Sequence, residues 1–433
     1  MFRRLGVQCK QAVATCQRSS FAGQKGKSSF AGAASIKFQQ TGLDLQWHTG
    51  EQFSLNPNFL RERCQSDTMV DPATKQPTGN PHDFPEDLKF TNATMLNEDL
   101  LEVSFNDGHV SRFDTGRLHA ELVNFRDSPM QVEQYQRPAL KLWSGDFVPS
   151  QYDYNDIKEN PEIQFKIISD LLTSGAALVS NVPQESGAVC KFGQMLSTLR
   201  ETDWGPCFNV RTKPDADQGG AGGVKKDLAY TPKPIGFHTD NPYRWPTPDF
   251  QLLHAIEHCT CPGEAPCAEC SVLNYMVDGF YIAELLKQES PEAFELLSTI
   301  PVRFENNGGD GGSALVHVAP HFELEQGATQ EGRRLQALRF SAKSGQYSPP
   351  MEKDVAAAFY KARRRFSELA HDSKHINTMQ FKPGDCVVFD NQRILHARSE
   401  ILPTDGERWV QGCYIDRDGL WLNYERYRRK FLY

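Results

Sequence analysis

The stretch Ile235-Gly-Phe-His238-Thr-Asp240-Asn-Pro242 places a histidine and an aspartate at positions i and i+2. Side chains alternate between the two faces of an extended strand, so residues with this spacing point the same way. One imidazole and one carboxylate are two members of the 2-His-1-carboxylate facial triad, which leaves open positions on Fe(II) for a cosubstrate and O₂. A lone His-x-Asp pair is weak evidence, so the prediction depends on further ligands elsewhere in the chain.

The C-terminal part of the chain supplies a candidate for the third ligand and one for a cosubstrate anchor. His396 follows the strand-like run Cys386-Val-Val-Phe389 and is the best candidate for the second histidine. Arg408 lies a short step further on, and arginine can bind the distal carboxylate of 2-oxoglutarate through a bidentate fork that lysine cannot copy. Together with His238 and Asp240, these residues predict a site that binds iron and 2-oxoglutarate.

Further short motifs extend the pattern over most of the chain. They are Ala229-Tyr230-Thr231, His238-Thr-Asp240-Asn-Pro, Gln251-Leu-Leu-His254, Val277-Asp-Gly-Phe280, Phe389-Asp-Asn391, Leu395-His396 and Arg408. In this order they resemble the gamma-butyrobetaine dioxygenase and trimethyllysine dioxygenase family, whose members are Fe(II)- and 2-oxoglutarate-dependent hydroxylases. The resemblance runs from about residue 45 to the C-terminus and is more specific for the family than for the substrate.

The resemblance implies a mainly β fold with flanking helices. A double-stranded β-helix, or jelly roll, would form the catalytic domain behind a small N-terminal β domain. We expect a transit peptide or disordered segment over 1–40, the small β domain over 41–125, a linker over 126–160 and the dioxygenase domain over 161–433. The hydrophobic pattern predicts helices over 164–172, 193–199 and 355–369, strands over 176–180, 271–273, 338–340 and 386–389, and a hairpin over 100–113.

Composition indicates an ordinary globular protein. The 433 residues are 39% hydrophobic and 24% charged, with a formal net charge of -8 and a pI of about 5.9. An acidic chain without a basic stripe lacks the electrostatic footprint of a nucleic-acid-binding protein, and no apolar run approaches the length of a membrane span. We therefore expect no nucleic-acid partner and no membrane partner, and a small molecule as substrate.

The first forty residues differ from the rest in charge. They contain basic residues but no acidic residue before Asp44, and they are rich in Ser, Ala and Gly. A basic, acid-free and weakly amphipathic N-terminus is typical of a mitochondrial transit peptide, with a plain disordered tail as the alternative. We expect a mitochondrial location, with a cytoplasmic one as the alternative.

Two groups of cysteines raise the question of a second metal. In the family that the chain resembles, the N-terminal module often holds a structural zinc through three clustered cysteines and a later histidine. Only Cys64 and His109 match that pattern here, and two ligands do not make a closed tetrahedral site, so we expect no zinc there. A separate insert carries a C-x-C and a C-x-x-C motif that could be an inert loop, a redox site or a metal site: Cys259, Cys261, Cys267 and Cys270.

The substrate pocket is predicted from the same resemblance. A quaternary ammonium is recognised by aromatic faces through cation–π attraction, and the matching positions are Trp204, Phe208 and Tyr230. Asn241 stands where the family has a further aromatic residue, directly after the metal-binding aspartate. Asp227 stands where a butyrobetaine enzyme has an asparagine, and its charge would favour the amino group of trimethyllysine over the carboxylate of butyrobetaine.

The sequence therefore predicts a dioxygenase that hydroxylates a trimethylammonium compound. By resemblance the reaction is gamma-butyrobetaine to L-carnitine, with 2-oxoglutarate converted to succinate and CO₂, O₂ as oxidant and ascorbate as reductant. Trimethyllysine hydroxylation is the alternative within the class. A zinc-dependent or redox protein with a vestigial iron site is the alternative outside it. The resemblance also suggests a homodimer.

Overall fold

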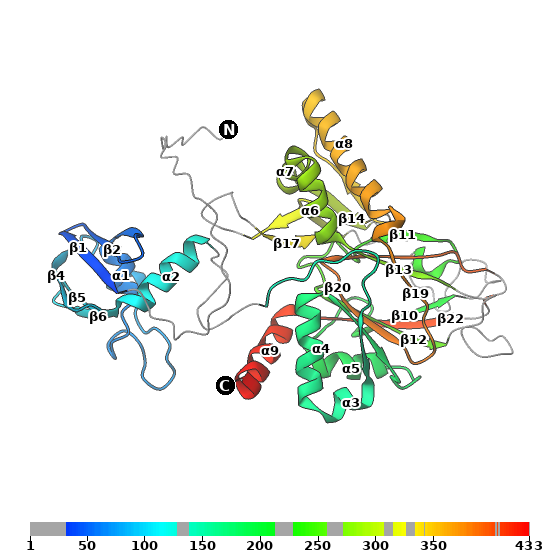
Figure 1. Ribbon diagram of the computed structural model, residues 1–433, viewed down its shortest axis with the longest axis horizontal. Coiled ribbons are helices and arrows are strands. Elements are labelled where there is room, and N and C mark those ends of the chain that lie inside the picture. The colour runs from blue at the N-terminus through cyan, green and yellow to red at the C-terminus, as the bar shows by residue number, and fades with distance from the viewer. Residues whose placement is uncertain are drawn as a thin grey trace. The chain divides into compact units, whose positions relative to one another are not determined.

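The computed structural model describes residues 32–127, 138–212, 228–257, 272–306, 315–325, 334–341, 343–402, 405 and 408–432 (Figure 1). The chain divides into two compact units, one that ends at Leu122 and one that begins at Val123. Across the described ranges, no helix combines the length and the apolar character that crossing a bilayer would require.

The first unit is built from two three-stranded antiparallel sheets. In β5 every second side chain is buried, so Leu101, Val103 and Phe105 enter the core of this unit. The predicted hairpin over 100–113 is confirmed, and Gly108 supplies the positive φ of its turn. The elements are β1 (Ala33–Gln39), β2 (Gly42–Trp47), β3 (Gln52–Leu55), α1 (Pro57–Glu62), η1 (Pro81–Asp83), β4 (Phe90–Asn97), β5 (Leu100–Phe105), β6 (Val110–Asp114) and α2 (Thr115–Asp127).

Two β-sheets form the centre of the second unit. The larger follows the order β10-β22-β12-β20-β8-β7, with β9 paired to β22, and the smaller follows the order β11-β21-β13-β19. All pairings are antiparallel except that of β7 with β8. The strands are β7 (Ser150–Asp153), β8 (Ala176–Ser180), β9 (Leu199–Arg200), β10 (Cys207–Thr212), β11 (Ile235–His238), β12 (Phe250–Glu257), β13 (Asn274–Asp278), β19 (Asn377–Met379), β20 (Cys386–Asp390), β21 (Ile394–Arg398) and β22 (Arg408–Ile415).

The two sheets pack on each other and are covered by helices on their outer faces. Met276 and Ile394 of the smaller sheet share a hydrophobic cluster with Val387 and Phe389 of the larger one. The larger sheet is backed by α3 (Tyr154–Glu159), α4 (Pro161–Thr173), α5 (Ala188–Leu196) and α9 (Arg417–Leu432), and the smaller by α6 (Gly279–Glu289), α7 (Pro291–Thr299) and α8 (Lys353–Ala370) (Figure 1).

Short strands and 3-10 turns complete the second unit. Strands β14, β15 and β18 form one small sheet and β16 pairs with β17. Their bounds are β14 (Val302–Asn306), β15 (Leu315–Ala319), β16 (Phe322–Leu324), β17 (Leu335–Leu338) and β18 (Gly345–Tyr347), with η2 (Leu228–Tyr230) and η3 (Ser373–His375) as the turns.

Strand β12 shows how the sequence assigns side chains to the two sides of the larger sheet. The strand is central and almost wholly buried, so its apolar residues are nearly continuous. Phe250 and Leu252 face the helices, whereas Gln251 and Leu253 line a pocket on the other side. Because side chains alternate between the two faces of a strand, Gln251 lies on the side of the sheet that carries the site described below.

Most of the predicted elements are confirmed, and several boundaries are wrong. The helices over 164–172 and 355–369 lie within α4 and α8, and the strands over 176–180 and 386–389 are β8 and β20. The helix predicted over 193–199 instead ends at Leu196, because the chain turns into β9 at Leu199. Strand β13 begins at Asn274 rather than 271, and β17 ends at Leu338. Strand β7 and helix α3 lie in the segment expected as a linker, and β7 extends the larger sheet.

A buried ion pair fastens the end of β13 to the strand pair that carries the site. Asp278 and Arg393 are 0% and 1% exposed, and the carboxylate accepts from Arg393 Nε at 3.0 Å and from a terminal nitrogen at 2.7 Å. The backbone N–H groups of Trp143 and Phe280 also donate to the Asp278 carboxylate. Removal of the carboxylate charge would leave the guanidinium buried without its counter-charge.

We expect Asp278→Asn to lower the free energy of unfolding by about 3–5 kcal/mol, the usual cost of breaking a buried ion pair on one side. Urea denaturation followed by circular dichroism measures the change. The matched control is Glu289→Gln, which removes the carboxylate of a half-exposed pair with Arg365 and should have a much smaller effect. Equal effects of the two substitutions would contradict this structural role for Asp278.

Candidate active site

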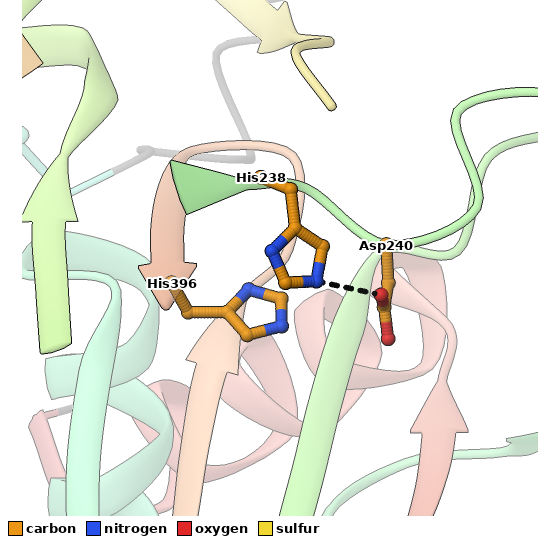
Figure 2. Close-up of side chains that lie close together, drawn as sticks. All are labelled: His238, Asp240 and His396. Atoms are coloured by element: carbon orange, nitrogen blue, oxygen red, sulfur yellow. Dashed lines mark ion pairs between the residues drawn. The ribbon is translucent and has the colours of Figure 1, made fainter. Parts of the chain in front are cut away.

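His238, Asp240 and His396 converge at one point of the second unit. Strands β11 and β21 pair with His238 directly opposite His396, and the centroids of the two rings lie 4.1 Å apart. Asp240 follows β11, and its Oδ1 lies 3.2 Å from His238 Nε2. One ligand atom from each of the three residues lies within 4.8 Å of the other two (Figure 2). Figure 2 shows the three side chains pointing toward one another, as the ligands of one small ion would.

Hydrogen bonds to other atoms orient these side chains. His238 Nδ1 lies 2.9 Å from the Gly236 carbonyl oxygen, which fits an Nδ1–H donor and leaves Nε2 available as a ligand. Asp240 Oδ2 accepts from Gln251 Nε2 at 2.8 Å and from the Tyr414 hydroxyl at 3.0 Å. The second oxygen, Oδ1, is the one turned toward His238.

The backbone at Asp240 is also held by partners distant in sequence. Asn391 Oδ1 accepts from the Asp240 amide at 2.7 Å, and Asn391 Nδ2 donates to the Asp240 carbonyl oxygen at 3.0 Å. Next to it, the Thr239 amide donates to the Phe340 carbonyl oxygen at 2.6 Å, and the Phe340 amide donates to Thr239 Oγ1 at 3.2 Å. Asn391 and Thr239 are both 0% exposed, so these bonds fix the position of the carboxylate.

The protonation states suit metal coordination. Burial raises the pKa of Asp240, but the positive charge of Lys343 and the proximity of His238 outweigh it and hold that pKa well below its usual range. Burial and the neighbouring His238 hold the pKa of His396 well below that of a free imidazole. Burial and Asp240 raise the pKa of Tyr414 well above its ordinary value, so the phenol keeps the proton that it donates. A carboxylate beside two imidazoles is a donor set that Fe(II) accepts.

A pocket of about 120 Å³ opens beside these three residues, with Arg408 in its wall. Arg408 is 6% exposed, and in the part of the chain that the structure describes its Nε has no hydrogen-bond partner. Burial, with a smaller contribution from Arg398, lowers the pKa of Arg408 to about 9. A buried guanidinium that has no ion pair among the described residues is stabilised by an anion, so Arg408 fits the distal carboxylate of 2-oxoglutarate.

Aromatic side chains form another wall of the pocket. Trp204, Phe208 and Tyr230, predicted as substrate residues, all line it, and Tyr414 joins them. The ring centroids of Trp204 and Phe208 lie 6.3 Å apart, and those of Phe208 and Tyr414 lie 5.2 Å apart. Tyr414 thus connects the aromatic wall to the carboxylate of Asp240, which places the two features side by side.

Asn241 also lines the pocket, as predicted, but its amide is bound by neighbouring tyrosines. Asn241 Nδ2 donates to the Tyr414 hydroxyl at 2.8 Å, and the Tyr243 hydroxyl donates to Asn241 Oδ1 at 2.6 Å. The backbone at Asn241 has a φ of 53°, a conformation that asparagine adopts more readily than most residues. Its side chain therefore positions Tyr414 in addition to facing the cavity.

Asp227 and the cysteine insert, with Cys259, Cys261, Cys267 and Cys270, lie outside the described residues. The Cys64 and His109 pair lies within them. In the first unit, Cys64 Sγ lies 3.1 Å from His109 Nε2 and 3.2 Å from Ser66 Oγ. The thiol is thus engaged in hydrogen bonds within its own unit.

Several residues around the pocket were not predicted as site residues. Gln251 and Asn391 occur in the quoted motifs, but their bonds to Asp240 were not foreseen. Tyr414 could have been found, because even-numbered residues of β22 share one face and Arg408 already points into the pocket. Lys343 had no signal in the sequence: it follows a short strand in a polar turn, yet its Nζ lies 3.0 Å from Asp240 Oδ1.

Two histidines and a carboxylate beside a pocket that holds a buried arginine and an aromatic wall define an Fe(II)- and 2-oxoglutarate-dependent dioxygenase. The chain belongs to the family described as "Taurine catabolism dioxygenase TauD, TfdA family", whose model matches residues 137–414. A second model, "Gamma-butyrobetaine hydroxylase-like, N-terminal", matches residues 35–119. The resemblance noted in the sequence is confirmed, and the protein is a dioxygenase of this class.

Curated relatives cover nearly the full chain. The gamma-butyrobetaine dioxygenase of Pseudomonas sp. (strain AK-1) is 30% identical over 91% of this chain and 94% of its own length. The gamma-butyrobetaine dioxygenase of Homo sapiens is 25% identical over 87% of this chain and 92% of its own length. The mitochondrial trimethyllysine dioxygenase of Mus musculus is 27% identical over 87% of this chain and 83% of its own length.

Proposed function

We propose that this dioxygenase hydroxylates gamma-butyrobetaine to L-carnitine and converts 2-oxoglutarate to succinate and CO₂. The observation that carries the proposal is the composition of one pocket, in which the His238, Asp240 and His396 set, the buried Arg408 and the aromatic wall meet. The names of the relatives support the substrate, because gamma-butyrobetaine dioxygenases occur among them at up to 30% identity.

Each group of residues has a separate task in this proposal. His238, Asp240 and His396 would hold Fe(II), which when bound supplies O₂ activation coupled to the oxidation of 2-oxoglutarate. Arg408 would bind the distal carboxylate of the cosubstrate and thereby set its orientation. Trp204, Phe208 and Tyr414 would face the trimethylammonium group, for which each aromatic face contributes about 0.5–2 kcal/mol. The apolar wall also limits the access of water.

Trimethyllysine is the second candidate substrate. Trimethyllysine dioxygenases occur among the relatives at 26–28% identity. The rat protein, for example, is 28% identical over 83% of the chain, against 30% for the Pseudomonas gamma-butyrobetaine dioxygenase. Both substrates carry the trimethylammonium group that the aromatic wall suits, so that wall does not separate them. The choice depends on what recognises the opposite end of the molecule.

A substrate panel tests the proposal. The iron-loaded protein is incubated with 2-oxoglutarate, O₂ and ascorbate, and succinate release is compared for gamma-butyrobetaine, trimethyllysine and taurine. We expect gamma-butyrobetaine to give the largest stimulation, with one carnitine formed per succinate by mass spectrometry. Preferential turnover of trimethyllysine or taurine would refute the proposed substrate. The absence of the weak absorption band of an anaerobic Fe(II)–2-oxoglutarate complex would refute the cofactor assignment.

Gln251 gives a further prediction, because it donates to the Asp240 oxygen that faces away from His238. We expect Gln251→Leu to weaken Mn(II) binding by about 10- to 100-fold, as loss of a partner of a metal ligand usually does. Titration followed by electron paramagnetic resonance measures the affinity. Gln411→Leu is the control, since Gln411 lies on the helix-facing side of β22 and bonds Gly187 and Asn209 instead. An unchanged affinity in Gln251→Leu would contradict this role.

Further proposals concern the rest of the protein. We infer that the two packed sheets are a double-stranded β-helix. The small β domain, expected over 41–125, would include β1, and the dioxygenase domain, expected over 161–433, would include β7 and α3, so the linker expected over 126–160 would end before β7. A mitochondrial transit peptide, expected over 1–40, would end before β1, because Ala33–Gln39 pairs with β2 in the first unit. The enzyme would form a homodimer. Ascorbate would serve as the reductant that maintains Fe(II). Cys64 and His109 would form a hydrogen-bonded pair without a structural zinc.

A further inference from the structure

Lys343 is a buried cation beside the proposed metal ligands. Its side chain is 11% exposed, its Nζ lies 3.0 Å from Asp240 Oδ1, and it lines the same pocket as the aromatic wall. The Thr239–Phe340 backbone contacts explain the placement, because they hold the segment before Lys343 against the segment that carries Asp240. The ammonium group therefore lies at the metal end of the pocket.

The described cations of the pocket have different environments. Arg398 donates to the carbonyl oxygens of Ala229, Thr231 and Lys233 at 2.7–3.1 Å, so its guanidinium is engaged with the backbone. Arg408 is the buried guanidinium assigned above to the distal carboxylate of 2-oxoglutarate. Lys343 is the remaining cation of the described lining, and a flexible lysine stem can turn its ammonium from one oxygen toward another.

The chemistry of the substrate makes a cation useful at this place. In gamma-butyrobetaine, one methylene separates the carbon that is hydroxylated from the carboxylate, so the carboxylate must lie close to the metal when that carbon does. The trimethylammonium group lies on the other side of the reacting carbon. In trimethyllysine, the carbon next to the carboxylate also bears an ammonium group, which a neighbouring lysine would repel.

We propose that Lys343 binds the carboxylate of the substrate and makes the pocket selective for an anion at that end. The inference rests on the proposed function. The aromatic wall takes the cationic end and Lys343 takes the anionic end, so the two together set the direction in which the molecule lies. Asn274 lies in the same lining with a buried side-chain amide whose Nδ2 has no hydrogen-bond partner among the described residues, and it supplies a second donor for a carboxylate.

The test measures binding rather than turnover. Protein loaded with Mn(II) and saturated with 2-oxoglutarate is titrated without O₂ in a calorimeter with gamma-butyrobetaine, with butyltrimethylammonium, which lacks the carboxylate, and with trimethyllysine. We expect Lys343→Met to weaken gamma-butyrobetaine binding at least tenfold and to change butyltrimethylammonium binding less than twofold. The preference should move toward trimethyllysine. Lys343→Arg keeps the charge and should retain most of the affinity.

The controls separate this role from support of the metal site. Lys374→Met removes an exposed lysine that pairs with Asp372 and should leave all three affinities unchanged. If Lys343→Met weakened the binding of Mn(II), gamma-butyrobetaine and butyltrimethylammonium alike, the role of Lys343 would be to position Asp240 and not to bind the substrate. The proposal would then be wrong. Unchanged gamma-butyrobetaine affinity would also overturn it. Wild-type protein that binds neither trimethylammonium compound would instead refute the proposed function.

Discussion

Replacement of His238, Asp240 or His396 by alanine is expected to abolish 2-oxoglutarate turnover. Each substitution removes one of three proposed protein ligands, and a site with two remaining ligands should lose both its affinity for the metal and the geometry of its open positions. Succinate release should fall to the rate without enzyme, and Mn(II) binding should fall in parallel. The three side chains meet at the edge of a pocket rather than in a hydrophobic cluster, so the circular dichroism spectrum should stay unchanged.

The control for these variants is His82→Ala, which removes an exposed histidine of the first unit and should keep full turnover. Wild-type-like succinate release in any one of the three variants would show that the replaced residue is not an essential iron ligand. Loss of turnover with unchanged Mn(II) affinity would indicate a role in the reaction other than holding the metal.

Arg408→Lys is expected to weaken 2-oxoglutarate binding about 10- to 100-fold. Lysine keeps the charge but replaces a two-bond fork with a single contact, and a hydrogen bond to a charged group contributes about 1.5–3 kcal/mol. With about 1.4 kcal/mol for each factor of ten, this cost predicts the stated range. The dissociation constant for 2-oxoglutarate, measured without O₂ on the Mn(II)-loaded protein, tests it.

Arg211→Lys is the matched control for this substitution. Arg211 lies one residue before the partner of Arg408 in the β10–β22 pair, but its guanidinium stacks over the Trp409 ring at 3.8 Å on an exposed surface. The affinity for 2-oxoglutarate should stay the same in this variant. An affinity that changes less than twofold in Arg408→Lys would mean that another residue anchors the cosubstrate.

The features that sequence reasoning placed correctly are those that depend on local geometry. The i and i+2 spacing of His238 and Asp240 puts both side chains on one side of a strand end, and the helical periods of α4 and α8 put their apolar residues on one face. The start of β13 at Asn274 was missed because the residues before it carry the same apolar pattern as the strand itself. The first residue of a strand cannot be located from a short, continuous apolar run alone.

Lys343 shows what local pattern cannot provide. Its distance to Asp240 depends on backbone contacts between Thr239 and Phe340, which join segments far apart in the chain. The role of Asn241 likewise depends on Tyr243 and Tyr414, which the fold brings to its amide. Polar contacts of this kind follow from strand order and register, and neither can be obtained from the composition of a single segment.

The pairing of His238 with His396 has a consequence for the order of events during synthesis. About half of the second unit lies between strand β11 and strand β21, so the two histidines meet only after β12, β13, α6, α7 and α8 have been made. A chain that is still being synthesised, or one truncated before β21, cannot form the complete set. A ligand that binds only the folded state stabilises that state by mass action. Metal binding should therefore follow the pairing of β11 with β21 and then stabilise the paired state. The rate of metal uptake during refolding would therefore report on the slow, long-range step of folding rather than on diffusion of the ion.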